Sequence, residues 1–366
     1  YVIASFDIEC DSSHGDFPQT KKSFKKLATD VFDSMRTLFK SPEGHRILDD
    51  VQSHLYDLIH MGFHQDTSVV GNVIVRSYLN SGRIDMNRVF IADNRIPSEE
   101  SLTKVCEEIV EEEFVYSNFF KDEKPTGAVR DKCIQRIKVI MMEYLRTSDN
   151  REVTELGDPI IQIGTVFHKY GLGKEDMVRH IVVIGPEDDM DDKDICDTLD
   201  EYNIEVKRCK NEAELLMEWV KQMNQMDPDF ITGYNIFGFD FKYLYERADI
   251  CFCDNYKKGK TPCKKYRGQT YHQGNCQMRK FLNIGKIDSI SDHKHLWHHS
   301  SKRCKYVQKD LNSSALGDNS LYYIHMDGRI LFDIQKEVQK AHSLESYKLD
   351  NVAAHFMRGQ LKEIRE

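Results

Sequence analysis

Alternating apolar and polar positions at the start of the chain predict a β-strand. Residues 2–9 read VIASFDIE, with Ala4 and Phe6 on one side of the alternation and Asp7 and Glu9 on the other. Because strand side chains point to opposite faces in turn, the apolar set would pack on a core and the carboxylates would face away from it. Further strands are predicted at residues 159–168, 178–184, 230–232, 321–324 and 329–332.

The last two of these segments flank a turn signal. Asp327 and Gly328 lie between them, and Asp-Gly is a favoured pair in tight hairpin turns. We therefore predict that residues 321–324 and 329–332 pair as a hairpin. The first two of the further strands, joined by a loop with two glycines, are predicted to pair in the same way.

Apolar residues spaced three and four apart predict amphipathic helices between residues 20 and 150. Polar links separate four such segments, at residues 24–38, 51–59, 102–109 and 134–145. Later in the chain strands and helices alternate, with helices predicted at residues 211–226, 239–248, 333–342 and 347–357. This order indicates an α/β fold with a mixed central sheet and a mostly helical insertion. The expected organisation is a first strand within residues 1–18, the insertion at 19–156 and the rest of the α/β domain at 157–366.

Composition narrows the class of protein. The 366 residues carry a formal net charge of −9 and are 40% hydrophobic, which argues against a disordered or low-complexity chain. No run approaches the ~20 apolar residues that would span a bilayer. We interpret the ten cysteines as reduced, intracellular thiols, since a chain of this length does not need disulfides. The chain starts at Tyr1, without a methionine or signal segment, and we expect it to be cut from a longer protein.

Positive charge is concentrated in one stretch of the α/β region. Residues 257–309 contain 14 lysines and arginines, five histidines and only two acidic residues, Asp288 and Asp292. Two interpretations stay open for this stretch, a surface that contacts phosphates and a solvated loop.

The basic loop, at about residues 251–309, also contains residue types that bind zinc. The candidates are Cys251, Cys253, Cys263, His272 and Cys276. The first two cysteines are closer in sequence than in most structural zinc sites, so we favour reduced thiols over a zinc site.

The carboxylates on the first strand are candidate metal ligands. Asp7 and Glu9 lie two residues apart on one strand face, where they would repel each other and raise each other's pKa. A divalent cation relieves this repulsion, because hard cations take oxygen ligands. The pattern alone is weak, since about ten such pairs are expected by chance in this composition. An exposed strand face without function is the simpler interpretation until a third ligand is found.

A second motif supplies that ligand. Residues 227–240 read DPDFITGYNIFGFD, which predicts a strand, a glycine turn and the start of a helix. The motif places Tyr234, Asn235, Phe239 and Asp240 at the carboxyl end of the strand, where open α/β sheets usually bind ligands. Asp240 could then join the two carboxylates of the first strand around a metal. Asn235 could donate hydrogen bonds to a phosphate or base, and Phe239 could stack on a base.

These motifs resemble a known family. FDIEC at residues 6–10 and the run at residues 227–240 resemble the first two exonuclease motifs of family B DNA polymerases. GDPIIQIGT at residues 157–165 is similar to the second strand of that domain. The segments at residues 313–334 and 346–357 are similar to those that follow the second motif in delta-like polymerases. The long insertions resemble the polymerases of large DNA viruses.

The resemblance implies an RNase H-like 3′→5′ proofreading exonuclease that releases a deoxynucleoside monophosphate from a primer 3′ end. Two divalent cations, Mg²⁺ or Mn²⁺, would be held by Asp7, Glu9 and Asp240. Asp7 would bridge both cations, Glu9 would bind the one that carries the attacking water, and Tyr234, Asn235 and Phe239 would contact DNA. The expected partners are primer–template DNA, the single-stranded primer 3′ end and the remaining polymerase domains, with a processivity factor as a candidate for the insertion. The expected location is the nucleus or a cytoplasmic site of viral replication.

The resemblance also implies a third exonuclease motif that does not occur within residues 1–366. The family's third exonuclease motif, a Tyr and an Asp four residues later, should follow Met357, and we expect it, like the polymerase palm, beyond residue 366. Tyr347 and Asp350 are one residue too close together to form that motif. Two other functions stay open, a stand-alone exonuclease of the same metal-carboxylate type acting on DNA or RNA, and a non-catalytic nucleic-acid-binding module. Only the last predicts that Asp7 is dispensable.

Overall fold

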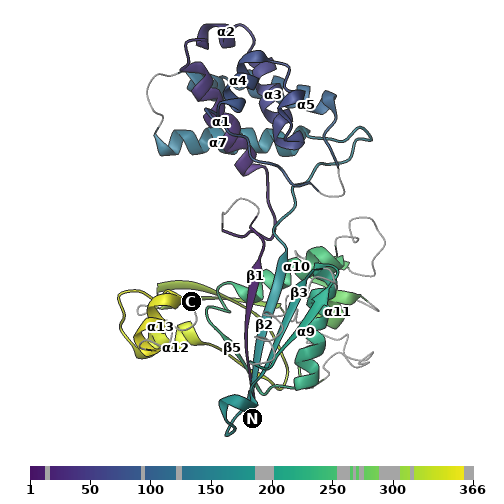
Figure 1. Cartoon of the computed structure of the whole chain (residues 1–366), viewed down its shortest axis with the longest axis vertical. Coiled ribbons are helices and arrows are strands. Elements are labelled where there is room, and N and C mark those ends of the chain that lie inside the picture. Colours follow the sequence, from purple (N-terminus) through teal and green to yellow (C-terminus); the bar gives the residue numbers. More distant parts are fainter. Residues whose placement is uncertain are drawn as a thin grey trace. The chain divides into compact units, whose positions relative to one another are not determined.

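A computed structural model gives the fold of the chain (Figure 1). It describes residues 1–12, 17–91, 95–120, 126–185, 202–253, 264–266, 269–271, 276–287, 306–313 and 317–357. The chain divides into two compact units, one formed by Tyr1–Asp11 with Pro159–Glu366 and the other by Ser12–Asp158. The boundaries of these units lie a few residues from those drawn from the sequence.

The first unit is built on a six-stranded mixed sheet with strand order β10-β5-β1-β2-β3-β4. Within this sheet, β2 is the one strand that runs antiparallel to β1. β5 and β10 run parallel to β1. β3 and β4 do so as well, since β3 pairs antiparallel with β2 and parallel with β4. The strands are β1 (Val2–Cys10), β2 (Ile160–Lys169), β3 (Val178–Ile184), β4 (Ile204–Cys209), β5 (Phe230–Gly233) and β10 (Ile330–Asp333).

The core explains why β1 occupies the middle of the sheet. Ala4, Phe6 and Ile8 are buried, as their alternation predicts, and the ring of Phe6 lies 5.3 Å from that of Trp219 and 5.5 Å from that of Phe241. These two rings come from helices α9 (Glu212–Met226) and α10 (Asp240–Cys253), which pack on the sheet (Figure 1). The predicted first strand and both predicted helices are therefore confirmed.

The remaining elements of the first unit are mostly short. Helices α11 (Gln277–Phe281), α12 (Ile334–Ala341) and α13 (Leu349–Met357) follow α10. Two small antiparallel pairs form apart from the main sheet, and they consist of β6 (Lys264–Tyr266) with β7 (Gln269–Tyr271) and β8 (Tyr306–Ser313) with β9 (Gly317–Ile324).

The hairpin predicted around Asp327 and Gly328 is wrong. The turn itself forms, with Gly328 at φ +81°, but the chain passes through it from one sheet to another. β9 pairs with β8, whereas β10 pairs in parallel with β5 in the main sheet. β8 begins inside the stretch predicted as a basic loop, at about residues 251–309, and was not predicted as a strand, so β9 was left without its actual partner. The predicted pairing of β2 with β3 is confirmed.

The second unit is helical and has its own apolar core. The four predicted segments are confirmed as α1 (Lys25–Phe39), α3 (Val51–His64), α5 (Glu99–Glu111) and α7 (Gly127–Tyr144). Three shorter helices accompany them, α2 (Gly44–Leu48), α4 (Val73–Asn80) and α6 (Glu113–Phe120). Among the described residues, no helix is long and apolar enough to cross a membrane.

Candidate active site

Two of the three predicted metal ligands meet at the carboxyl end of β1. Asp7 is exposed on that strand, and Asp240 is the first residue of α10 and only 2% exposed. Their carboxyl groups lie close enough to shift each other's pKa, although 232 other residues separate them in sequence. Two carboxyl groups in such contact must share a proton unless a cation replaces it.

Burial and charge act in the same direction on this pair. Desolvation by the surrounding protein raises the pKa of Asp7 above its ordinary value. Burial, together with the nearby charge of Asp7, raises the pKa of Asp240 to about 8. Within the described part of the chain, neither carboxylate forms an ion pair with a lysine, arginine or histidine. The arrangement therefore favours a ligand that brings positive charge.

One oxygen of Asp240 fits a metal ligand. Its Oδ1 atom is buried and has no hydrogen-bond partner among the described residues. A buried carboxylate oxygen without a partner is costly, and oxygen ligands of this type suit Mg²⁺ and Mn²⁺. The donor set at this point of the fold thus fits a hard divalent cation.

Glu9 does not complete a cluster with the other two carboxylates. It is exposed two residues along β1 from Asp7, on the same strand face. No group of three or more His, Cys, Asp or Glu side chains in the described residues lies close enough together to hold a metal ion. The structure therefore brings together Asp7 and Asp240 and leaves Glu9 beside them.

The strand pairing around these carboxylates leaves room beside them. Gly164 on β2 pairs with Asp7, and a Cβ atom at Gly164 would meet no atom within 4 Å. The register between β1 and β2 shifts after Glu9, so that Cys10 pairs with Ile160. Bulges of this kind re-aim side chains next to functional sites, and this one was not visible in the sequence.

The turn between β5 and α10 requires its glycine. A Cβ atom at Gly233 would lie 2.6 Å from the backbone oxygen of Phe6, so no larger residue fits between the two strands. Asn235 follows with φ 60°, a left-handed conformation that asparagine tolerates better than most residues. This geometry turns the chain sharply enough for Asp240 to begin α10 against Asp7.

The sequence analysis missed the residue that holds this turn. Asp333, at the end of β10, is 1% exposed, and its carboxylate accepts hydrogen bonds from the backbone N–H groups of Asn235 and Phe237. The signal was present, because FDI follows a predicted strand in the segment similar to delta-like polymerases. A single aspartate at a strand end is too common to select without the tertiary contact.

The predicted DNA-contacting residues take different positions. The Tyr234 hydroxyl donates to the backbone oxygen of Tyr347 at 2.6 Å, which joins the turn to the segment before α13. The ring of Phe239 is partly buried, 5.1 Å from that of Tyr243. Asn235 is partly exposed, with its side chain against Gly238.

The second motif also contains two aspartates at the opposite end of β5. Asp227 and Asp229 precede the strand, and both pair with Lys286, at 3.2 and 2.8 Å. Asp229 also accepts a hydrogen bond from the backbone N–H of Val2, and Asp227 pairs with Arg329 at 3.0 Å. These aspartates therefore join the starts of β1, β5 and β10 and do not belong to the candidate active site.

A buried ion pair supports the sheet near the site. Glu212 accepts two hydrogen bonds from the Arg247 guanidinium, at 2.9 and 2.6 Å, and one from the backbone N–H of Ile160. Cys251 donates its thiol to Glu212, which gives this zinc candidate another role. Cys263 and His272 lie outside the described residues, so the choice between reduced thiols, which the sequence favours, and a zinc site is not tested.

Cysteine chemistry does not suit the candidate site. Cys10 follows Glu9, and burial raises the pKa of its thiol to about 12. A thiol that stays protonated at neutral pH is a poor nucleophile, so Cys10 is not a candidate reactive group.

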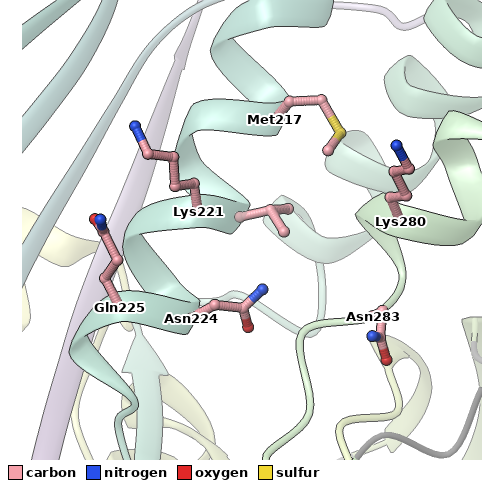
Figure 2. A pocket seen from close by; sticks show the side chains of 7 residues that line it. Met217, Lys221, Asn224, Gln225, Lys280 and Asn283 are labelled. Carbon is pink, nitrogen blue, oxygen red and sulfur yellow. The ribbon is translucent and has the colours of Figure 1, made fainter. Parts of the chain in front are cut away.

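A shallow groove between α9 and α11 lies apart from the carboxylates (Figure 2). Its lining contains no acidic side chain and consists of Met217, Val220, Lys221, Asn224, Gln225, Lys280 and Asn283. The predicted basic surface at residues 257–309 falls largely outside the described residues and is not tested by this geometry.

Comparison with known proteins identifies the family. Residues 140–352 match the exonuclease domain of DNA polymerase family B, and this match includes Asp240 and Asp333. The chain belongs to this family, and its six-stranded mixed sheet is that of an RNase H-like exonuclease domain. β1 precedes the matched residues, yet it fills the place between β5 and β2 in the sheet.

Relatives include viral and cellular polymerases. The chain is 31% identical to a DNA polymerase of Pyramimonas orientalis virus, over 98% of this chain and 26% of that protein. It is 25% identical to a DNA polymerase of Phaeocystis pouchetii virus, over all of this chain and 34% of that protein. It is 29% identical to the DNA polymerase delta catalytic subunit of Dictyostelium discoideum, over 57% of this chain. The chain thus spans about a quarter to a third of the two viral relatives.

Proposed function

We propose that this chain carries the 3′→5′ proofreading exonuclease of a replicative family B DNA polymerase. The observation that supports it most is the contact between Asp7 on β1 and Asp240 on α10, with a buried Asp240 oxygen that lacks a partner among the described residues. Membership of the exonuclease-domain family agrees with this proposal.

The proposed reaction is hydrolysis of the phosphodiester bond before the primer-terminal nucleotide. A water oxygen forms a bond to phosphorus, the bond from phosphorus to the 3′ oxygen breaks, and the leaving oxygen takes up a proton. A deoxynucleoside monophosphate is released. Two divalent cations would supply a nucleophilic water at neutral pH and neutralise charge on the leaving oxygen.

The chain's own groups receive separate roles in this proposal. Asp7 and Asp240 would hold the two cations in place of the proton that their contact otherwise favours, with Asp7 as a ligand common to both. Glu9, exposed beside Asp7, is assigned as the third ligand. Asn235 is assigned to phosphate or base recognition and Phe239 to stacking on the terminal base, while Tyr234 contacts the strand from the same turn.

The wider assignments follow from the family. The DNA partners are a primer–template and the single-stranded primer 3′ end, and nucleotide addition belongs to other domains of the same polypeptide. The unit Ser12–Asp158 is an insertion into the exonuclease domain, for which a processivity factor is the candidate partner. The site of action is that of DNA replication.

The test is removal of a mismatched primer 3′ nucleotide with Mg²⁺ by the complete gene product that contains these residues. An Asp7→Ala/Glu9→Ala variant should lose more than about 100-fold in rate, because even groups behind metal ligands contribute 10–100-fold. Glu205→Gln, an exposed carboxylate on edge strand β4, is the matched control and should keep full activity. Equal rates in the double variant and the wild type would refute the proposal and favour a non-catalytic binding module.

A further inference from the structure

Asp333 makes more contacts than its position at a helix start requires. Its Oδ1 atom accepts from the backbone N–H groups of Gln335 and Asn235, both at 2.9 Å. Its Oδ2 atom accepts from the backbone N–H of Phe237 at 3.0 Å. The Gln335 contact caps α12, and one oxygen is enough for a cap. The contacts to Asn235 and Phe237 therefore need a different explanation.

These two contacts hold the first turn that leads into α10. The backbone N–H groups of Gly238 and Phe239 donate to the oxygen of Asn235, and that of Phe241 donates to the oxygen of Ile236. A displacement of Asn235 or Phe237 would therefore move the start of the helix. Asp240 lies three residues after Phe237, so its carboxylate would move with it.

The turn is held from its other side by a separate segment. The backbone oxygen of Phe237 accepts from the N–H of Tyr322 on β9 at 2.8 Å. Phe237 is thus fixed at its N–H by β10 and at its oxygen by β9. Of these two anchors, only Asp333 uses a side chain, so it is the one that a substitution can remove selectively.

The local conformation explains why the turn needs an anchor. Asn235 has φ 60°, a left-handed conformation that is uncommon for residues other than glycine, although asparagine tolerates it better than most. The carboxylate of Asp333 is almost fully buried and close to both ends of the strained residue. Burial keeps water from competing for the backbone N–H groups.

We propose that Asp333 is a positioning residue of the exonuclease site. Its carboxylate fixes the turn at residues 234–239 and thereby places Asp240 against Asp7. The inference rests on the proposed function and adds a residue that touches neither the substrate nor the metal ligands. Its effect should appear in the rate of the chemical step and also in binding of the DNA strand, because the same turn carries Tyr234, Asn235 and Phe239.

The sharpest variant is Asp333→Asn, measured in the complete gene product. The amide oxygen can still cap α12 and accept from Asn235, whereas the amide nitrogen would face the Phe237 N–H, and two donors cannot bond. We expect kcat to fall by about 10–100-fold, as for other groups that orient metal ligands, and KM for a single-stranded primer to rise as well, because the displaced turn carries Tyr234, Asn235 and Phe239. Amide hydrogen exchange at residues 235–239 should become faster. Asp333→Ser, another good helix cap, should behave in the same way if Asn is not tolerated.

Two controls separate positioning from loss of stability. Asp57, in the helical unit, is also buried and also accepts from two backbone N–H groups, those of Gly71 and Asn72. Asp57→Asn should lower Tm without lowering kcat at a temperature well below the transition. A matching loss of kcat in Asp57→Asn, or wild-type kcat and exchange in both Asp333 variants, would overturn the inference.

Asp7→Ala identifies which proposal has failed. Loss of activity in Asp7→Ala together with an unaffected Asp333→Asn would overturn only the positioning role. Full activity in Asp7→Ala would overturn the proposed function, and the positioning role for that reaction with it.

Discussion

Aspartates from one sequence motif lie at both ends of strand β5, and the two ends give them neighbours of opposite charge. At the amino end, Asp227 and Asp229 pair with Lys286, and Arg329 joins Asp227. At the carboxyl end, Asp240 meets another acid, Asp7. A pair with cations stabilises the fold, whereas a pair of acids is stable only with a shared proton or a bound cation. The difference separates two carboxylates that cations neutralise from one that faces another acid, within fourteen residues of sequence.

The pKa directions express the same contrast. The ammonium group of Lys286 lowers the pKa of Asp229, and the charges of Asp229 and Asp227 raise the pKa of Lys286 in return. Burial raises the pKa of Asp240 to about 8. The fold thus favours the charged form at one end of β5 and the protonated form at the other.

The largest expected effect comes from replacing one aspartate by asparagine at each end of β5, which removes one negative charge. Asp240→Asn should abolish exonuclease activity, with a loss of more than about 100-fold, because a metal ligand is removed. It should not destabilise the metal-free protein, since it removes repulsion with Asp7. Asp229→Asn should do the opposite, lowering Tm while keeping activity. Initial rates on a mismatched primer measure activity, and calorimetry in EDTA measures Tm. An Asp240→Asn variant that is stable and keeps full activity would contradict the distinction between the two ends.

A second prediction concerns the arginine at the amino end. Arg329 is buried and donates to the backbone oxygens of Ile284 and Pro228 as well as pairing with Asp227. Arg329→Met should cost about 2–4 kcal/mol of unfolding free energy, because two buried carbonyl groups lose their donors. Denaturant titration measures the loss. Activity well below the transition should persist, since the carboxyl end of the strand is untouched.

The third prediction is an opposite pH dependence at the two ends. Asp229 has a lowered pKa when folded, so its contribution to stability is present above its unfolded pKa and is lost as the pH falls. Asp240 has a raised pKa when folded, so its contribution is present below about pH 4 and is lost as the pH rises to about 8. Tm between pH 4 and 9 in EDTA should therefore fall on the alkaline side in the wild type. Asp240→Asn should flatten that side, and Mg²⁺ should raise Tm there by replacing the proton.

The smallest effect is expected for Lys286. Its ion pairs with Asp227 and Asp229 are reached by solvent, so Lys286→Met should lower Tm by no more than about 4 °C. The loss should shrink further in high salt, which screens exposed pairs. A larger fall that salt does not reduce would mean that this cluster depends on packing of the lysine stem.

Local patterns in the sequence were reliable where one periodicity decided the outcome. The alternation in VIASFDIE predicted β1 and its buried face, and apolar spacing predicted α9 with Trp219 inside. Strands with short or charge-rich patterns were missed, although residues 204–207 do alternate. β4 (IEVKRC) is an edge strand with exposed charges, and β8 lies in a stretch that looked like a basic loop.

Strand partners and contacts at the site could not be predicted from local patterns. The Asp327–Gly328 turn was recognised, but its strands enter different sheets, because partner choice depends on which edges the rest of the fold leaves open. Asp333 was not selected for the same reason, since its importance arises from two backbone groups about a hundred residues away. Glu9 was expected to join Asp7 and Asp240, and the structure leaves it beside them.

The sequence by itself determined the longest helices, the central strand, the two acidic motifs and the family resemblance, because these depend on residues close together in the chain. Only the tertiary structure decided which aspartates of the second motif are neutralised and which one meets Asp7. The reason is physical: the ionisation of a carboxylate depends on burial and on charges within a few ångströms, and those neighbours come from distant parts of the chain.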